Sequence, residues 1–212
     1  MVILGSQSHF IPLGMNYLAH VYLSGDDDEI KVGNFIGDYV KGKTYTQYPE
    51  LVQKGILIHR NIDTFTDSHP IVHRSKSHLS LKYHKYAGII IDIFYDHFLA
   101  NEWKNFSKEP LKVFVYGFYE TLISHFALLP KRVKQFLPIF ILNNWLESYL
   151  TTKGIGIVLH RMSKRTSLPD YSKFAITELE QNYDQYRADF YEYFPLLIDY
   201  IEHKHKIRID RP

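Results

Sequence analysis

Residues 86–103, YAGIIIDIFYDHFLANEW, decide the fold class of this chain. Their apolar residues recur at steps of four, three and four, at Ala87, Ile91, Phe94 and Phe98. This period marks one face of an α-helix, because residues three or four apart lie above one another on the helix surface. The stretch therefore predicts a helix that buries at least one face.

The same helical period runs through most of the chain. It recurs in the segments 109–129, 130–150 and 172–205, with Pro130 near the start of the second and Pro195 as a candidate break in the third. Strand-like alternation and the Asn-Gly turns that close β-hairpins are missing. We therefore expect an all-α protein, a single compact helical bundle of about seven or eight helices.

Length and composition favour one soluble domain. The chain has 212 residues, of which 45% are hydrophobic and 23% charged, and its net charge of +2 is too small to indicate a nucleic-acid partner. No apolar run reaches the roughly 18–20 residues of a membrane span, and no secretory signal opens the chain. The absence of Cys excludes a disulfide scaffold and thiolate chemistry. We expect a cytoplasmic protein without a membrane partner, of undetermined oligomeric state.

Three segments are expected along the chain. Residues 1–14 are interpreted as an extension ahead of Met15, residues 15–205 as a single all-helical domain, and residues 206–212 as a loose basic tail. The 12 histidines are the one unusual feature of the composition, because His is both a common metal ligand and a proton-transfer group.

Polar residues recur in pairs spaced four apart inside apolar surroundings. A buried charge without a partner costs several kcal/mol, so these pairs need an explanation. Helix bundles build metal centres from inward-pointing carboxylates and imidazoles at this spacing, and a His/Asp set without thiolates suits Mn²⁺, Mg²⁺, Fe²⁺ or Zn²⁺. The four pairs are Asn16 and His20, Asn34 and Asp38, His59 and Asp63, and Asp92 and Asp96.

A structural explanation exists for each polar residue. A single buried His–Asp pair is commonly a satisfied core hydrogen bond, although four such pairs favour a shared polar centre.

In DTFTDSHP, residues 63–70, Asp67 and Ser68 can cap the next helix, or Asp67 and His69 can extend the centre as supporting or proton-transfer groups. The remaining histidines are interpreted as surface or core residues: His9, His73, His78, His84, His125, His160, His203 and His205.

Four of these stretches together resemble the motifs of a known family, the acyl carrier protein phosphodiesterases. They are MNYLAHVYLS (15–24), VGNFIGDYVKG (32–42), GILIHRNIDTFTDSHP (55–70) and DIFYDHFLANEW (92–103). The resemblance is specific up to about Trp103 and weaker beyond it. It implies an all-helical fold related to the HD-domain metal-dependent phosphohydrolases, although the order Asp96-His97 departs from the typical HD dipeptide.

The resemblance also implies an activity. Members of the family use a divalent metal, usually Mn²⁺, to help water cleave the phosphodiester that joins 4′-phosphopantetheine to a serine of holo-acyl carrier protein. It identifies Asp38 as an acidic residue that the activity requires. The family's other motif positions are occupied here by His59, Asp63, Asp92, Asp96 and His97.

These matches lead to assigned roles. Asp38, His59, Asp92 and Asp96 are expected as metal ligands, with Asp63 as a fifth ligand or as the group that orients His59. Arg60 is a candidate phosphate clamp, and the acidity of carrier proteins makes four groups of Lys and Arg candidate docking surface. These groups are Lys82 and Lys85; Lys104, Lys108 and Lys112; Lys131, Arg132 and Lys134; and Arg161, Lys164 and Arg165. The groups expected to protonate the serine oxygen or to orient the ligands are His20 and His97.

Three other functions remain open at this point. An HD-like phosphohydrolase could act on a nucleotide or another small phosphodiester, because substrate choice depends on pocket shape. A non-catalytic helical protein could bind carrier protein and use the polar centre structurally. An oxidase could bind two iron ions with the same ligands.

Overall fold

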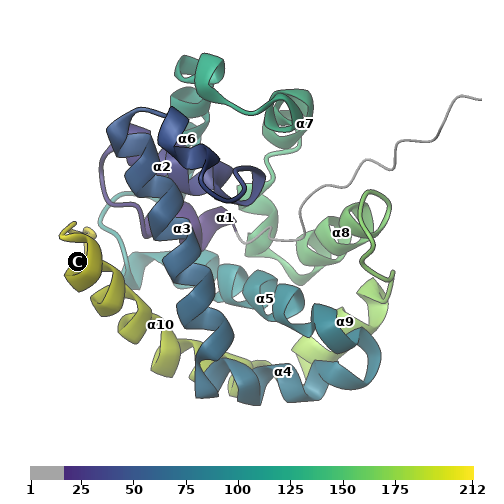
Figure 1. Ribbon diagram of the computed structural model, residues 1–212. Helices are drawn as coiled ribbons and strands as arrows, with labels where there is room; N and C mark the ends of the chain where they lie inside the picture. Colours follow the sequence, from purple (N-terminus) through teal and green to yellow (C-terminus); the bar gives the residue numbers. More distant parts are fainter. Residues whose placement is uncertain (1–16) are drawn as a thin grey trace, which may run out of the picture.

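The computed structural model describes residues 17–212. The predicted extension 1–14, which contains His9, lies outside the described residues, and so does Asn16. The described chain contains no strand, which confirms the all-α prediction. It has ten α-helices rather than seven or eight. They are α1 (Tyr17–Tyr22), α2 (Asp28–Ile36), α3 (Glu50–Ser68), α4 (Pro70–Tyr83), α5 (Ala87–Asn101), α6 (Leu111–Ser124), α7 (Lys131–Leu142), α8 (Thr152–Ser163), α9 (Ser172–Gln181) and α10 (Tyr183–His205) (Figure 1).

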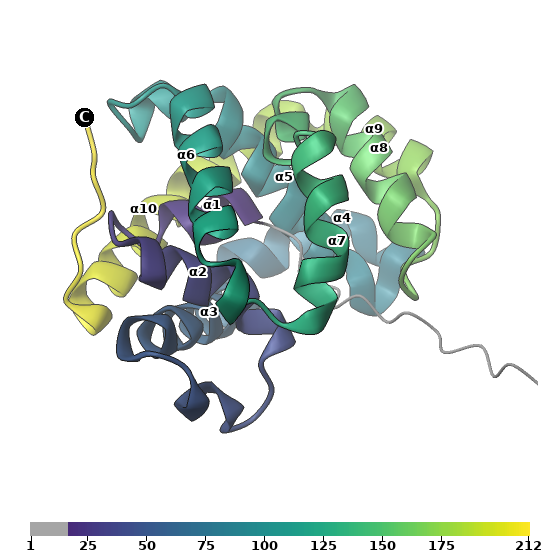
Figure 2. The ribbon, with the colours of Figure 1, turned by 90° about the horizontal axis from the view of Figure 1, so that it is seen from above.

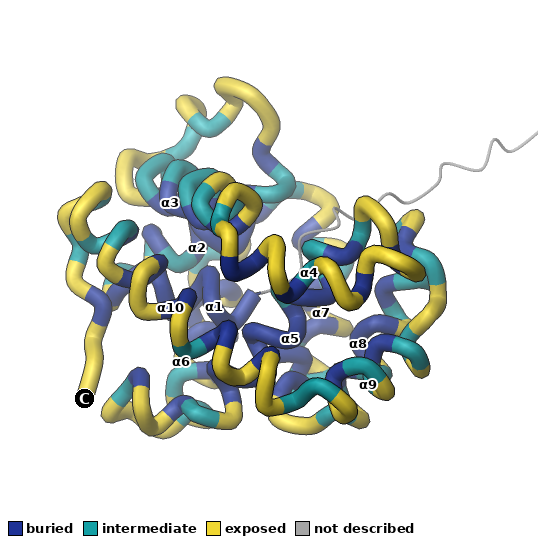
Figure 3. The backbone as a smooth tube through the Cα atoms, turned by 90° about the horizontal axis from the view of Figure 1, so that it is seen from below, coloured by how far each residue is buried: buried dark blue, intermediate teal, exposed yellow. Residues whose placement is uncertain are grey.

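Helix α5 lies at the centre of the fold. It contacts α1, α4, α8 and α10, and 11 of its 15 residues are buried. The quoted stretch is therefore buried on nearly every side. Figure 3 shows α1 and α5 largely in the dark blue of buried residues, whereas exposed residues alternate along α4. Helices α6 and α7 cover the side of the molecule opposite α4 (Figures 1 and 2).

Two glycines let α2 and α3 cross in close contact. A Cβ atom added to Gly33 would lie 2.1 Å from the carbonyl oxygen of Val52, and one added to Gly55 would lie 2.2 Å from that of Ile30. No side chain fits into such gaps, so both positions require glycine. The crossing sets the C-terminal end of α2 and the following 3₁₀ turn, η1 (Gly37–Tyr39), against the middle of α3.

Two helix ends differ from the expectation. The segment 130–150 is not one helix, because α7 ends at Leu142 and Asn144 takes a left-handed conformation with φ of 43°. The segment 172–205 breaks at Asn182 instead of Pro195, which lies inside α10. Proline removes one backbone hydrogen bond, and the buried side of α10 holds the helix together across that gap.

The basic tail is not loose. After Lys206 ends α10 in a left-handed conformation, Ile209 is 2% exposed and its N–H donates to the Glu202 carboxylate at 2.7 Å. Arg211 pairs with Asp199 and Glu202. The tail therefore folds back along α10, because it carries an apolar residue that it buries. None of the helices within 17–212 combines the length and the apolar content that crossing a bilayer demands.

The α2–α3 crossing predicts different outcomes for two Gly→Ala substitutions. Gly55→Ala forces a Cβ against the backbone of α2, and overpacking of this kind is expected to lower the free energy of unfolding by about 1–3 kcal/mol. Gly117→Ala in α6 is the matched control, because nothing lies within 4 Å of its added Cβ. It should raise stability by about 0.5–1 kcal/mol. Urea unfolding measures both, and equal changes would contradict the close crossing.

Candidate metal centre

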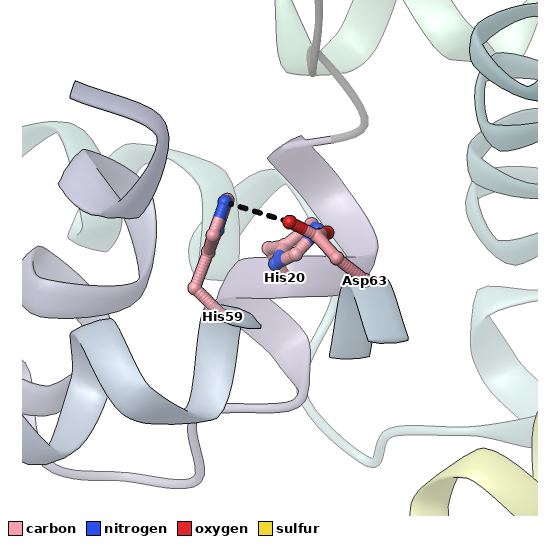
Figure 4. Close-up of side chains that lie close together, drawn as sticks. All are labelled: His20, His59 and Asp63. Atoms are coloured by element: carbon pink, nitrogen blue, oxygen red, sulfur yellow. Dashed lines mark ion pairs between the residues drawn. The ribbon is translucent and has the colours of Figure 1, made fainter. Parts of the chain in front are cut away.

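Three side chains from two helices meet near the α2–α3 crossing. His20 comes from α1, and His59 and Asp63 lie one turn apart on α3 (Figure 4). Their candidate ligand atoms all lie within 4.8 Å of one another. The Asp63 carboxylate is 3.3 Å from Nε2 of His59 and 3.4 Å from Nε2 of His20. The spacing of four on α3 therefore does place its pair on one face, as the sequence indicates.

Two further acids border this cluster. Asp38, on η1, places its carboxylate 3.4 Å from Nε2 of His59. Gly37 makes this approach possible, since a Cβ there would lie 2.3 Å from Cγ of His59. Asp92 of α5 lines the same pocket of about 640 Å³ as Asp38 and Asp63. Four of the five expected metal ligands thus surround or face one space.

Asn34 orients His20. Its Nδ2 donates to the carbonyl oxygen of His20 at 2.7 Å and to Oγ of Ser24 at 2.9 Å, so its Oδ1 faces Nδ1 of His20 at 2.8 Å. Nδ1 of His20 therefore carries the proton and donates it. The lone pair on Nε2 then points towards the Asp63 carboxylate, which is the orientation that a metal-binding imidazole needs.

The unpaired polar atoms in the cluster fit a metal ion. Nε2 of His20 and both ring nitrogens of His59 are buried, and they make no hydrogen bond within the described part of the chain. Burying a polar atom without a hydrogen bond costs free energy, and a cation bound by the two Nε2 atoms would remove this cost for those two atoms. The imidazole and carboxylate donors suit Mn²⁺, Mg²⁺, Fe²⁺ or Zn²⁺. His20, His59 and Asp63 would hold the ion, with Asp38 and Asp92 beside them.

The ionisable residues of the site shift one another's pKa values. Burial alone would lower the pKa of His59, but the carboxylates of Asp38 and Asp63 outweigh burial and raise it. Burial alone would raise the pKa of Asp63, but His20 and His59 hold it below its usual range. Asp92 has less compensation, so burial and the negative charge of Asp63 raise its pKa to about 8. An additional positive charge in this space is therefore favourable.

Asp96 is placed differently from the expectation that it binds metal. Its side chain is fully buried, and its two carboxylate oxygens accept the backbone N–H groups of Leu18 at 3.1 Å and of Ala19 at 2.8 Å. Burial raises its pKa to about 7, against the lowering effect of these two hydrogen bonds. Asp96 thus caps the start of α1 and holds the helix that carries His20.

The structure does not bring His97 and His69 to the cluster. His97 lies on another side of α5, with Nδ1 2.6 Å from the carbonyl oxygen of Tyr149 and Nε2 3.1 Å from the hydroxyl of Tyr183. His69 caps α4 through the N–H of Ile71, which is the role considered above for Asp67 and Ser68. Both histidines therefore have structural contacts of their own.

Arg60 and Asp67 also have partners. The guanidinium of Arg60 donates to the carbonyl oxygens of Val40 and Gly42 and lies over the ring of Tyr45, so it braces the loop after η1. Asp67 is exposed at the pocket rim and pairs with Lys76 at 3.1 Å. The positive charge at the pocket comes from Lys76 and Lys85 instead of Arg60.

Most of the pocket wall has no signal in the sequence. The wall includes residues of α4 and of the turn after it: His73, Lys76, Ser77, Ser80, His84 and Lys85. A polar helix face is ordinarily solvated, so nothing in the pattern separates a pocket wall from open surface. Only the contact between α4 and α5 makes this face part of a pocket.

The raised pKa of Asp92 predicts how the stability of the metal-free protein depends on pH. Because its pKa rises from 3.8 to about 8, the folded protein holds this proton more tightly than the unfolded chain does. The free energy of unfolding should therefore fall as the pH rises from about 4 to about 8. Saturating Mn²⁺ should reduce this fall, because a cation stabilises the ionised carboxylate. Melting temperatures across this range, with and without Mn²⁺, measure both effects.

Two variants isolate the contribution of Asp92. Asp92→Asn removes the titrating group and should flatten part of the pH slope of the metal-free protein. Asp26→Asn changes an exposed acid and should keep the wild-type slope. Identical slopes for Asp92→Asn and wild type would contradict the role given to this carboxylate.

The region of the chain that matches known proteins contains all the residues of the cluster. The acyl carrier protein phosphodiesterase family matches residues 15–197. Three similar proteins bear that name: one from Pectobacterium atrosepticum (29% identity over 87% of this chain and 96% of the relative), one from Photorhabdus laumondii (30% over 90% and 96%) and one from Salmonella agona (31% over 87% and 96%). No solved structure matches the chain. With four fifths or more of its length aligned to these proteins, the chain belongs to the acyl carrier protein phosphodiesterase family.

Proposed function

We propose that this protein is a metal-dependent phosphodiesterase that releases 4′-phosphopantetheine from the serine of holo-acyl carrier protein. The name of its family and relatives supports the reaction. The observation that carries the metal dependence is that the buried Nε2 atoms of His20 and His59 make no hydrogen bond and converge on the Asp63 carboxylate. The proposed ion is Mn²⁺, with Mg²⁺, Fe²⁺ or Zn²⁺ as alternatives that the same donors accept.

The residues of the site have separable tasks in this reaction. A bound divalent cation supplies a charge that neutralises the phosphodiester oxygens and lowers the pKa of a water molecule. Asn34 and Asp96 position the imidazole of His20, the first by its hydrogen bond and the second through α1. The Asp63 side chain is 46% exposed, so the cluster opens into the pocket and a phosphodiester can reach it.

A basic hollow beside the cluster supports an acidic partner. Lys41, Lys131 and Arg132 line a hollow of about 370 Å³ whose wall also includes Asp38. Positive charge close to a reactive centre attracts an acidic protein and orients it on approach. We propose that the carrier protein docks here, in the cytoplasm, with its modified serine directed at Asp38 and the cluster.

A second candidate is a phosphohydrolase of a nucleotide or another small phosphodiester. The pocket volume of about 640 Å³ favours it, since sites for small molecules range from roughly 300 to 1,000 Å³. The relationship to HD-domain enzymes stays a prediction. Turnover of small phosphodiesters without turnover of holo-carrier protein would identify this candidate.

We expect Asp38→Ala to slow the release of the prosthetic group strongly. Loss of a carboxylate 3.4 Å from Nε2 of His59 should reduce the rate by roughly 100-fold or more. Intact-mass analysis of holo-acyl carrier protein with the enzyme and Mn²⁺ measures the product directly. Asp28→Ala, an exposed acid on α2, is the control and should leave the rate unchanged. Full activity of Asp38→Ala would refute the proposed site.

If the carrier protein docks at the basic hollow, reversing a charge there should impair partner binding alone. Lys131→Glu should raise KM for holo-acyl carrier protein by about tenfold with little change in kcat, because it reverses an exposed charge at the docking surface. Lys112→Glu reverses an exposed charge on α6 and should leave KM unchanged. A steady-state assay at low and high salt distinguishes the two variants. Equal KM values for both would place the partner elsewhere.

A further inference from the structure

The pocket extends well beyond the cluster, along the space between α4 and α5. Figure 1 shows the two helices side by side, and they are joined only by the short turn η3 (His84–Tyr86). On the other wall, α5 contributes Ala87, Gly88 and Ile89. One face of α4 contributes His73, Lys76, Ser77 and Ser80, which follow the i, i+3, i+4, i+7 spacing of a single helix face. We call this part of the pocket the α4–α5 groove.

The groove is longer than a phosphate group requires. His73 and Ser80 are seven residues apart on α4, which corresponds to a rise of about 10 Å along the helix. The cluster acids Asp63 and Asp92 border the same pocket as His84 and Lys85 of the turn. A phosphodiester bound at the cluster would therefore fill one part of the pocket and leave the groove to whatever is attached to the phosphate.

The groove walls suit an uncharged chain with amide groups. The hydroxyls of Ser77 and Ser80 donate to the carbonyl oxygens of Arg74 and Lys76, so their oxygens keep lone pairs that accept hydrogen bonds from a ligand. Ile89 of α5 adds apolar surface to the same pocket. Such a wall offers acceptors and apolar contact together, which matches a flexible chain that alternates methylene and amide groups.

Lys76 supplies positive charge where the groove joins the cluster. Its side chain is 18% exposed, its ammonium lies 3.1 Å from the Asp67 carboxylate, and its charge lowers the pKa of Asp92 against the stronger effects of burial and Asp63. The chain of Lys76 runs across Gly88, where an added Cβ would lie 3.1 Å from its Cε. An anionic phosphate end would meet this ammonium beside Asp67.

We propose that the α4–α5 groove binds the prosthetic arm of the substrate, with its phosphate at the metal cluster and its thiol end towards the turn at His84. This inference rests on the proposed function and assigns the arm a site. Asp38 belongs both to this pocket and to the basic hollow, so the cluster lies between the groove and the proposed docking surface. A phosphodiester at the cluster would then have the arm on one side and the carrier protein on the other.

Blocking the groove tests this assignment by binding. The probes are 4′-phosphopantetheine and inorganic phosphate, titrated by calorimetry into the Mn²⁺-loaded protein. Ser80→Trp fills the groove and should weaken 4′-phosphopantetheine at least about tenfold while leaving phosphate, which needs only the cluster, unchanged. Leu81→Trp is the control, because residue 81 is 85% exposed and lies outside the groove lining. It should bind both probes as the wild type does.

The outcomes separate this inference from the proposed function. Wild-type affinity of Ser80→Trp for 4′-phosphopantetheine, or an equal loss of phosphate binding, overturns the groove assignment, even if the wild type releases the prosthetic group in the intact-mass assay. Tight binding of 4′-phosphopantetheine that Ser80→Trp weakens upholds the groove assignment, even if that assay shows no release and the proposed reaction fails. Ser77→Trp provides the same test if Ser80→Trp does not fold.

Discussion

The close crossing of α2 and α3 is the constraint on which the site depends. Gly33 and Gly55 bring backbone atoms of the two helices into direct contact, and no other residue type fits there. Because η1 follows α2 directly, the crossing carries Asp38 to within 3.4 Å of His59. Gly37 repeats the same device at shorter range, against the ring of His59. These glycines thus position Asp38 beside His59, although they have no functional side chain.

The central helix α5 carries two acids in an apolar run, and each has a different reason to be there. Asp96 is fully buried, and two N–H groups of α1 compensate the cost of its burial. Asp92 accepts no such pair of hydrogen bonds from residues 17–212, and it faces the pocket with a raised pKa. The first acid holds α1, and therefore His20, in place. The second holds its proton near pH 7 in the metal-free protein, and a bound cation would stabilise its ionised form.

Helical period and residue chemistry predict the all-α class, which the structure confirms, and polar pairs that face the inside of the bundle. The pairs His59–Asp63 and Asn34–Asp38 were expected to point inwards, and both contribute to the cluster or its support. His97 was grouped with Asp96 because it follows it in the motif. Successive residues on a helix are turned by about 100°, so the two side chains point to different neighbours.

What the sequence determined by itself is therefore local: the all-α class, the spacing that puts polar residues on one face of each helix, and the family resemblance. These follow from the 3.6-residue period and from residue types, which need no knowledge of distant segments. The tertiary structure alone decided which faces meet. In the tertiary structure Asp96 accepts hydrogen bonds from α1, and Arg60 donates to the loop after η1. The polar face of α4 becomes one wall of a groove. The reason is that distances between residues far apart in the chain depend on how the helices pack, and no repeat within one helix records them.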